Sequence, residues 1–151
     1  WNEARTAAIA AECGIPCISA WTALRDALAA LDVRRFALGT PYPAAIHALS
    51  RPFFEAKGFT VTDDATLDII ATTDVPKVPP DRIDALVRSL NRADAGAVVL
   101  LATDLATLAS IEALEQATGL AVVSSNSCLL WAALRALGQA PPASLGRLSQ
   151  S

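Results

Sequence analysis

The chain has 151 residues, the length of a single domain that can bury a hydrophobic core of its own. Hydrophobic residues make up 53% and charged residues 18% of the sequence, a composition that argues against intrinsic disorder. The net charge is -3 and the sequence has no basic run, so nothing in the charge indicates that the chain binds nucleic acid or a membrane surface. Because no apolar run is long enough to span a bilayer, we expect a cytoplasmic domain. The charge makes a small-molecule ligand the expected partner.

The first half of the chain alternates between helical and strand patterns. Leu24, Leu28 and Leu31 recur at the spacing that buries one face of a helix, whereas the continuous apolar run near 34–40 is typical of a strand buried on both faces. In chain order we predict a helix over 1–12, a strand over 15–19, a helix over 20–31, a strand over 34–40, a helix over 44–58 that Pro52 kinks or breaks, and a short strand over 59–61.

The second half begins with an expected irregular segment. Three prolines in DVPKVPP (74–80) argue against regular structure over 62–80. The alternation then resumes, and a tail that begins at Gln139 is expected to be irregular. We predict a helix over 81–91, a strand over 95–102, a helix over 105–119, a strand over 120–125 and a helix over 127–138.

Strands that alternate with helices of this length predict an α/β fold with a doubly wound parallel sheet. In such a sheet, ligands bind outside the carboxyl ends of the strands. The side chains expected at these positions are mostly hydroxyls, amides and helix caps, with no lysine or arginine among them. The candidate binding residues are Ser19, Thr40, Pro41, Tyr42, Thr103, Asp104, Ser125 and Asn126.

Neutral donors beside the free backbone N–H groups of helix N-termini suit a carboxylate or a phosphate, and they can stabilise an enolate-like charge. The alternative is that residues such as Asp104 and Asn126 are ordinary N-caps, which prefer the same residue types. Four strand ends that carry such groups together favour an anion-binding site.

Other chemistries find little support in the sequence. The single histidine, His47, lies in a helical stretch without a G-x-S-x-G motif, so a surface or half-buried helix residue is preferred over a hydrolase base. Glycine-rich nucleotide-binding motifs are absent from the sequence. Cys13 and Cys17 form a C-x3-C without a second ligand pair, so we expect inert thiols and no metal ion.

Two stretches carry a resemblance to a known family. GTPYPAAI with RPFFEAKGFTV downstream, and LATLASIEALEQATGLAVVSSNSCLLWAALRALG, resemble the maleate cis-trans isomerase and arylmalonate decarboxylase branch of the aspartate/glutamate racemase superfamily. The resemblance runs from about Gly14 to Gly138. It implies an enzyme without a cofactor, built from two similar α/β lobes with four-stranded parallel sheets that close on a small dicarboxylate. We also expect a homo-oligomer, a dimer.

The resemblance assigns roles to particular residues. Tyr42 matches the family's active-site tyrosine, a hydroxyl donor to the substrate carboxylate or to developing charge, and Ser19 falls where the family has a threonine. Ser125 and Asn126 match the SSN turn that opens the last helix, where a structural role is the alternative.

The same resemblance shows a departure at the catalytic thiol. Family members use one or two cysteines, one per lobe, as acid/base or nucleophile. Ala102 falls where the second-lobe cysteine belongs, and alanine can do no acid/base chemistry. Cys128 lies beyond that turn and is not expected to replace the missing thiol.

The resemblance also implies a division of the chain and a function. We expect 1–32 to be a remnant of the first lobe, 33–126 a complete lobe, and 127–151 the last helix and tail returning toward the first lobe, whose front part with its cysteine would precede Trp1. The expected function is that of an isomerase, decarboxylase or racemase-like enzyme for a maleate- or arylmalonate-like acid, although Ala102 disfavours a racemase with two bases. The alternative is a catalytically inactive carboxylate-binding or assembly protein of the same fold.

Overall fold

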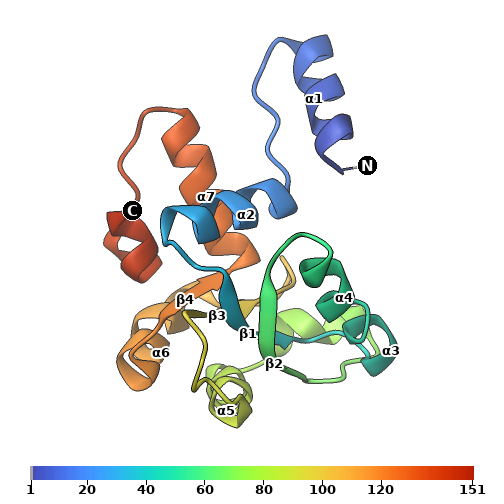
Figure 1. Cartoon of the computed structure of the whole chain (residues 1–151), viewed down its shortest axis with the longest axis vertical. Coiled ribbons are helices and arrows are strands. Elements are labelled where there is room, and N and C mark those ends of the chain that lie inside the picture. Colours follow the sequence, from blue (N-terminus) through green and yellow to red (C-terminus); the bar gives the residue numbers. More distant parts are fainter. Residues whose placement is uncertain (1) are drawn as a thin grey trace.

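The computed structural model describes residues 2–151, so Trp1, the first residue of the predicted helix over 1–12, lies outside them. These residues form an α/β fold around one parallel sheet, with helices on both sides (Figure 1). The strand order is β2-β1-β3-β4. The strands are β1 (Arg35–Thr40), β2 (Thr60–Thr66), β3 (Ala97–Leu100) and β4 (Ala121–Ser124). The predicted doubly wound parallel sheet is therefore confirmed.

The helices follow the predicted alternation with the strands. The α-helices are α1 (Asn2–Cys13), α2 (Ala20–Ala30), α3 (Ala44–His47), α4 (Ser50–Glu55), α5 (Pro80–Ser89), α6 (Ile111–Thr118) and α7 (Ser125–Ala136). Three 3-10 helices complete the fold: η1 (Thr72–Lys77), η2 (Leu108–Ser110) and η3 (Ala143–Gln150). Among residues 2–151, no helix has both the length and the apolar character that crossing a membrane requires.

Alternate side chains of the strands enter two separate hydrophobic cores. Phe36 and Leu38 of β1 belong to the core shared with α2, α4, α7 and η3. Ala37, between them, belongs to the core shared with α5 and α6. This alternation is the consequence of the strand's two-residue period, and helices on both faces explain why the two strands β3 and β4 are buried throughout.

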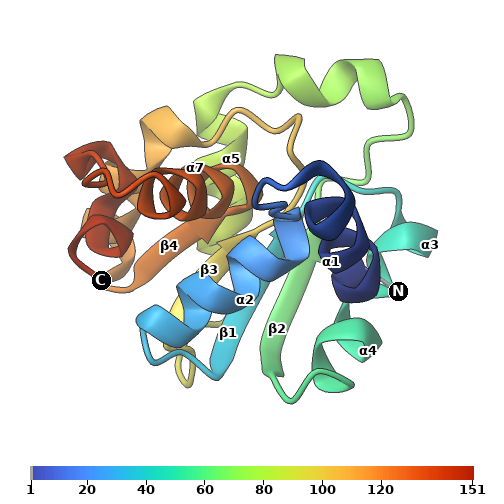
Figure 2. The same cartoon turned by 90° about the horizontal axis from the view of Figure 1, so that it is seen from above.

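The helix α1 stands at the edge of the molecule, joined to α2 by an extended connection (Figure 1), and the view from above shows α1 next to α2 (Figure 2). Glu3 of α1 accepts hydrogen bonds from the indole of Trp21 at 3.1 Å and from Arg25 at 2.8 Å. The predicted strand over 15–19 is wrong, because these residues belong to the connection. An extended segment becomes a strand only when a neighbouring strand pairs with it, and among residues 2–151 the four paired strands lie elsewhere.

Two predictions from local pattern need correction. The helix expected over 44–58 is divided into α3 and α4, and the break precedes Pro52, which occupies the first turn of α4, where a proline costs no helical hydrogen bond. Regular structure also occurs within 62–80, since β2 continues to Thr66 along the whole of β1 and η1 follows it. The polar sequence of this edge strand concealed it.

The C-terminal tail is not irregular as predicted. It forms η3, whose Leu145 and Leu148 are fully buried in the core beside α7. Glu115 of α6 secures this segment by accepting hydrogen bonds from the backbone N–H of Arg147 at 3.0 and 3.1 Å. Prolines and small residues gave the tail a loop-like composition, but packing against the sheet ordered it.

Candidate active site

The order of the strands creates a crevice at the carboxyl edge of the sheet. From β1 the chain proceeds to β2 on one side, whereas β3 lies on the other side. The loops that follow β1 and β3 therefore diverge, and α/β sheets bind ligands at such a switch point. Tyr42 lies in the loop after β1, and Ala102 lies in the loop after β3.

Tyr42 and Ala102 meet at this crevice. The Tyr42 hydroxyl accepts a hydrogen bond from the backbone N–H of Ala102, which lowers the pKa of the tyrosine. Burial of the ring and the negative charge of Asp104 act in the opposite direction and together raise the pKa of Tyr42 above its ordinary value of 10.0. The hydroxyl therefore keeps its proton at neutral pH and can donate it to an oxygen of a bound acid.

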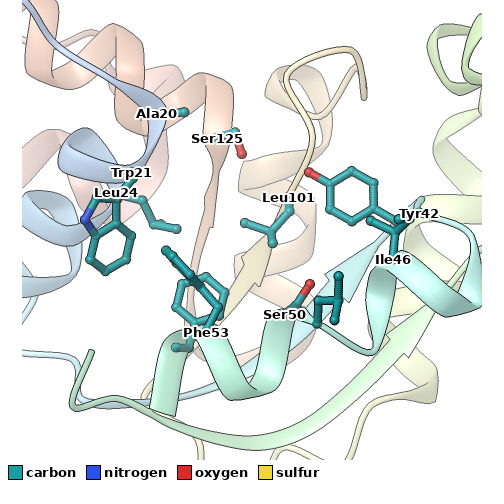
Figure 3. Close-up of a pocket in the computed structure, with 11 residues that line it drawn as sticks. Ala20, Trp21, Leu24, Tyr42, Ile46, Ser50, Phe53, Leu101 and Ser125 are labelled. Carbon is teal, nitrogen blue, oxygen red and sulfur yellow. The ribbon is translucent and has the colours of Figure 1, made fainter. Parts of the chain in front are cut away.

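A cavity of about 360 Å³ opens beside Tyr42 (Figure 3). The hydroxyls of Tyr42 and Ser125 point toward each other above Leu101, and Ser50 adds a third hydroxyl from α4. The remaining wall is apolar and consists of Ala20, Trp21, Leu24, Ile46, Leu49, Phe53, Phe54 and Leu101. The cavity can hold an apolar group while hydroxyls at one end bind polar atoms.

Ser125 begins α7, and its side chain is only 6% exposed. The N-cap of α7 is Ser124, whose hydroxyl accepts a hydrogen bond from the backbone N–H of Ser127 at 3.1 Å. The alternative that Asn126 is the N-cap of this helix is therefore wrong. The positive end of the α7 dipole lies next to Ser125 and favours a negatively charged ligand at that end of the cavity.

Asn126 instead holds the loop that follows β3. Its side-chain amide donates hydrogen bonds to the carbonyl oxygens of Thr103 at 3.0 Å and Leu105 at 3.4 Å. The structure thus brings Asn126 and Thr103 together through the backbone of the loop.

The alternative that Asp104 is an N-cap is also wrong. The loop continues beyond it to η2 at Leu108 and to α6 at Ile111, so helix N–H groups do not converge at 103–104. Ala102 has a positive φ of 84°, and this left-handed turn sends the chain away from the sheet before Leu105 returns to the core. A non-glycine residue in this conformation is strained, and such strain is concentrated at functional sites.

Of the eight residues predicted to bind a ligand, Tyr42 and Ser125 are the two that line the cavity within the described part of the chain. Ser19 caps α2, with its hydroxyl accepting from the backbone N–H of Thr22 at 3.1 Å. Thr40 is fully buried, and the carbonyl of the buried Pro41 accepts a hydrogen bond from the backbone N–H of Ile69 at 3.0 Å. These three residues therefore do not belong to the described lining of the cavity.

Sequence reasoning missed two features of this region. Trp21, Ile46 and Phe53 have the pattern of core residues, so nothing distinguished a cavity wall from a filled core. His47 is a half-buried helix residue, one of the two expected possibilities, but the sequence did not reveal that its ring is bonded to Thr40 and Asp64, seven and seventeen residues away. Partners at such separations leave no local signal in one sequence.

The thiols of the chain lie outside the cavity wall of the described residues. Burial raises the pKa of Cys128 to about 12, against a smaller opposing effect of its hydrogen bond with Ser127. Cys128 is therefore a neutral thiol at physiological pH and unsuited to act as a nucleophile. Cys13 is exposed and Cys17 half-buried, and residues 2–151 contain no group of three or more His, Cys, Asp or Glu arranged to hold a metal ion.

Comparisons with known proteins agree with this architecture. A family model for arylmalonate decarboxylase matches residues 1–149. The chain is 32% identical over 116 residues to a maleate isomerase of Nocardia farcinica, covering 76% of this chain and 46% of that protein. It is 31% identical over 140 residues to an arylmalonate decarboxylase of Bordetella bronchiseptica, covering 91% of this chain and 58% of that protein.

Solved structures show the same fold. The Nocardia farcinica maleate cis-trans isomerase bound to TRIS superposes with a TM-score of 0.91 at 29% identity, covering 98% of this chain and 63% of that one. An arylmalonate decarboxylase crystal structure gives a TM-score of 0.88 at 29% identity, covering 99% of this chain and 67% of that one. The chain spans about half the length of the curated relatives it matches. On the evidence of the family model, the related sequences and the shared fold, this chain belongs to the arylmalonate decarboxylase family.

Proposed function

We propose that the protein containing this chain is an isomerase- or decarboxylase-like enzyme that needs no cofactor and acts on a small dicarboxylic acid related to maleate or an arylmalonate. The observation that carries the proposal is the meeting of the Tyr42 hydroxyl with the Ala102 backbone N–H at the switch point, beside a cavity that also holds the Ser125 hydroxyl. Neutral donors in a half-buried site bind carboxylate oxygens and a developing enolate without a counter-ion.

In the proposed mechanism, this chain binds and orients the acid, and the thiol comes from another part of the protein. Tyr42 and Ser125 donate hydrogen bonds to one carboxylate of the substrate. The backbone around Ala102 and Thr103 lies beside this carboxylate and helps to hold it in place. The apolar wall holds the carbon substituent. In a decarboxylation, the bond to the departing carboxylate breaks, its electron pair stays on the substrate as an enolate, and a thiol returns a proton to that carbon.

The assignment of the thiol outside this chain has two supports. The resemblance matches Ala102 to the position of the family's second-lobe cysteine, and Cys128 is buried as a neutral thiol. A related structure also superposes on this chain, with a TM-score of 0.90 at 31% identity. It is a cysteine-to-serine mutant of the Nocardia farcinica maleate isomerase with a covalently bound succinylcysteine intermediate.

The substitution Ala102→Cys tests the proposal in the full-length protein. We expect the wild type to turn over maleate or phenylmalonate and to lose this activity when its thiols are alkylated. The new thiol should raise isomerase or racemase activity by about tenfold or more, because a second proton-transfer group typically contributes at least this factor. Turnover is measured by following the loss of each acid.

Ala102→Ser is the matched control, because serine has the same shape and suffers the same left-handed strain but has a much less acidic side chain. A folded Ala102→Cys protein without any gain over Ala102→Ser would refute the placement of Ala102. Thermal stabilisation of the wild type by dicarboxylates without any turnover would refute the enzyme and support the inactive carboxylate-binding protein.

A further inference from the structure

A chain of hydrogen-bonded polar side chains connects α3 and α4 with the sheet. The ring of His47 contacts the hydroxyl of Thr40 through Nδ1 at 2.9 Å and the carboxylate of Asp64 through Nε2 at 3.0 Å. The Nε of Arg51 donates to the other oxygen of Asp64 at 2.7 Å, and its guanidinium also bonds the carbonyl of Val61. The chain thus connects β1, α3, α4 and β2.

The partners of His47 fix the orientation of its ring. Asp64 accepts a hydrogen bond, so Nε2 carries a proton, and in the neutral ring Nδ1 accepts from the Thr40 hydroxyl. In the protonated ring Nδ1 donates to the Thr40 oxygen, and the contact persists. Thr40 is fully buried and the His47 side chain is only 11% exposed, so this contact is shielded from water.

The helix that carries His47 has little stability of its own. α3 has only four residues, and its N-cap, Pro43, makes no side-chain capping bond. So short a helix is held by tertiary contacts rather than by its own hydrogen bonds. α3 also contributes Ile46 to the cavity wall, and α4 contributes Ser50 and Phe53.

The backbone around Tyr42 is fixed separately. The carbonyl of Tyr42 accepts a hydrogen bond from the Thr66 hydroxyl, and the backbone N–H of Ala44 donates to Asp68 at 2.7 Å. These bonds hold the main chain of the loop. Phe54 in the hydrophobic core and Arg51 bonded to Asp64 anchor α4, while the side chain of His47 bonds α3 to both β1 and β2.

We infer that His47 is a positioning residue, which by bonding Thr40 and Asp64 sets the distance between the Tyr42 ring and the α3–α4 wall of the cavity. The inference rests on the proposed function for its consequence in catalysis, but its structural claim holds independently. Thr40 and Asp64 are the two anchors of His47, one at the carboxyl end of β1 and one on β2.

The test removes each anchor in the full-length protein and follows the ring of Tyr42 directly. Thr40→Val removes the hydroxyl at almost constant volume, and Asp64→Asn removes the carboxylate that orients the ring. Selectively labelled tyrosine gives NMR signals for Tyr42, assigned by their loss in Tyr42→Phe. In both variants we expect these signals to move, with kcat falling about tenfold or more and KM changing by less than about threefold.

Asp63→Asn is the matched control, because Asp63 is the neighbour of Asp64 but bonds the backbone N–H of Asn91 at 2.7 Å. We expect unchanged Tyr42 signals in this variant. His47→Gln replaces Thr40→Val if the latter does not fold, since glutamine can still reach Asp64 but has no ring nitrogen for Thr40.

The two readouts separate the two proposals. Unchanged Tyr42 signals in folded variants that lack either anchor would overturn the positioning role, as would an equal displacement in Asp63→Asn. A wild-type protein without turnover of any dicarboxylate would refute the proposed function, whereas the NMR comparison would still decide the role of His47.

Discussion

Tyr42 lies in the loop after β1, and its hydroxyl contacts the backbone of the diverging loop after β3. Its ring is half-buried, its hydroxyl accepts a hydrogen bond from the backbone N–H of Ala102, and the negative charge of Asp104 lies nearby. A neighbouring negative charge disfavours the tyrosinate, and burial does so more strongly. Tyr42 is thus kept as a neutral donor, the form that a carboxylate ligand needs.

We expect Tyr42 to titrate above pH 10 and to make stability depend on pH in the alkaline range. The pKa of Tyr42 is raised from 10.0 in the folded state. The contribution of Tyr42 to the free energy of unfolding is therefore fully present below the pKa of the unfolded state and is lost as the pH rises through the pKa of the folded state. Tyrosinate absorbance measures the titration, and urea unfolding on both sides of pH 10 measures stability. Tyr42→Phe should remove this pH dependence, and a midpoint at or below 10 would contradict the burial argument.

Short helical elements at the edges of the sheet depend on single side-chain contacts. η3 is held by Glu115, whose carboxylate accepts hydrogen bonds from the backbone N–H groups of Val122 at 3.0 Å and of Arg147 at 3.0 and 3.1 Å. Gly146 precedes Arg147 with a φ of 61°, and a Cβ there would lie 2.5 Å from the Glu115 carboxylate. The carboxylate cannot yield without losing these hydrogen bonds.

Gly146→Ala should lower the free energy of unfolding by about 2–4 kcal/mol, through left-handed strain and loss of the Glu115 contacts. Gly138→Ala is the control, because Gly138 has a φ of 68° but its added Cβ would meet nothing within 4 Å. This control should cost only the strain, about 1–2 kcal/mol. Urea unfolding compares the two, and equal losses would show that the Glu115 contact contributes nothing.

At the scale of the whole molecule, an aromatic cluster joins elements that are distant in sequence. Phe54 of α4 lies with its ring centroid 5.0 Å from Phe36 of β1 and 6.2 Å from Trp21 of α2. Phe59, just before β2, packs against the same rings. Edge-to-face contacts of this kind add to the stability gained by burial. The cluster fixes the wall of the cavity to the core of the sheet.

Phe54→Ala should destabilise the protein by about 3–5 kcal/mol, because it empties a core position that is only 2% exposed. Phe53→Ala is the matched control, since this neighbouring side chain is 45% exposed and should cost less than about 1.5 kcal/mol. Thermal and urea unfolding of the two variants check the difference. Similar losses for both would contradict the assignment of Phe54 to the core.

The sequence by itself determined the layers of the fold. The continuous apolar runs of β1, β3 and β4 and the spacing of leucines in α2 are local signals, and each states which faces of one element are buried. The resemblance around Tyr42 and the SSN turn then indicated the family. These signals need no knowledge of the partner that covers each face, so one sequence carries them.

Only the tertiary structure decided which of the polar residues share the cavity. Residues 15–19 have a strand pattern but lack a paired neighbour in the described chain, whereas the loop-like tail is ordered by the burial of Leu145 and Leu148. Ser125 and Tyr42 face each other because α7 and the β1 loop meet at the switch point. Thr40 and Asp64 both contact His47 because β1, β2 and α3 pack together. Periodicity reports the buried faces of one element, whereas contacts between residues distant in the chain depend on how the elements pack.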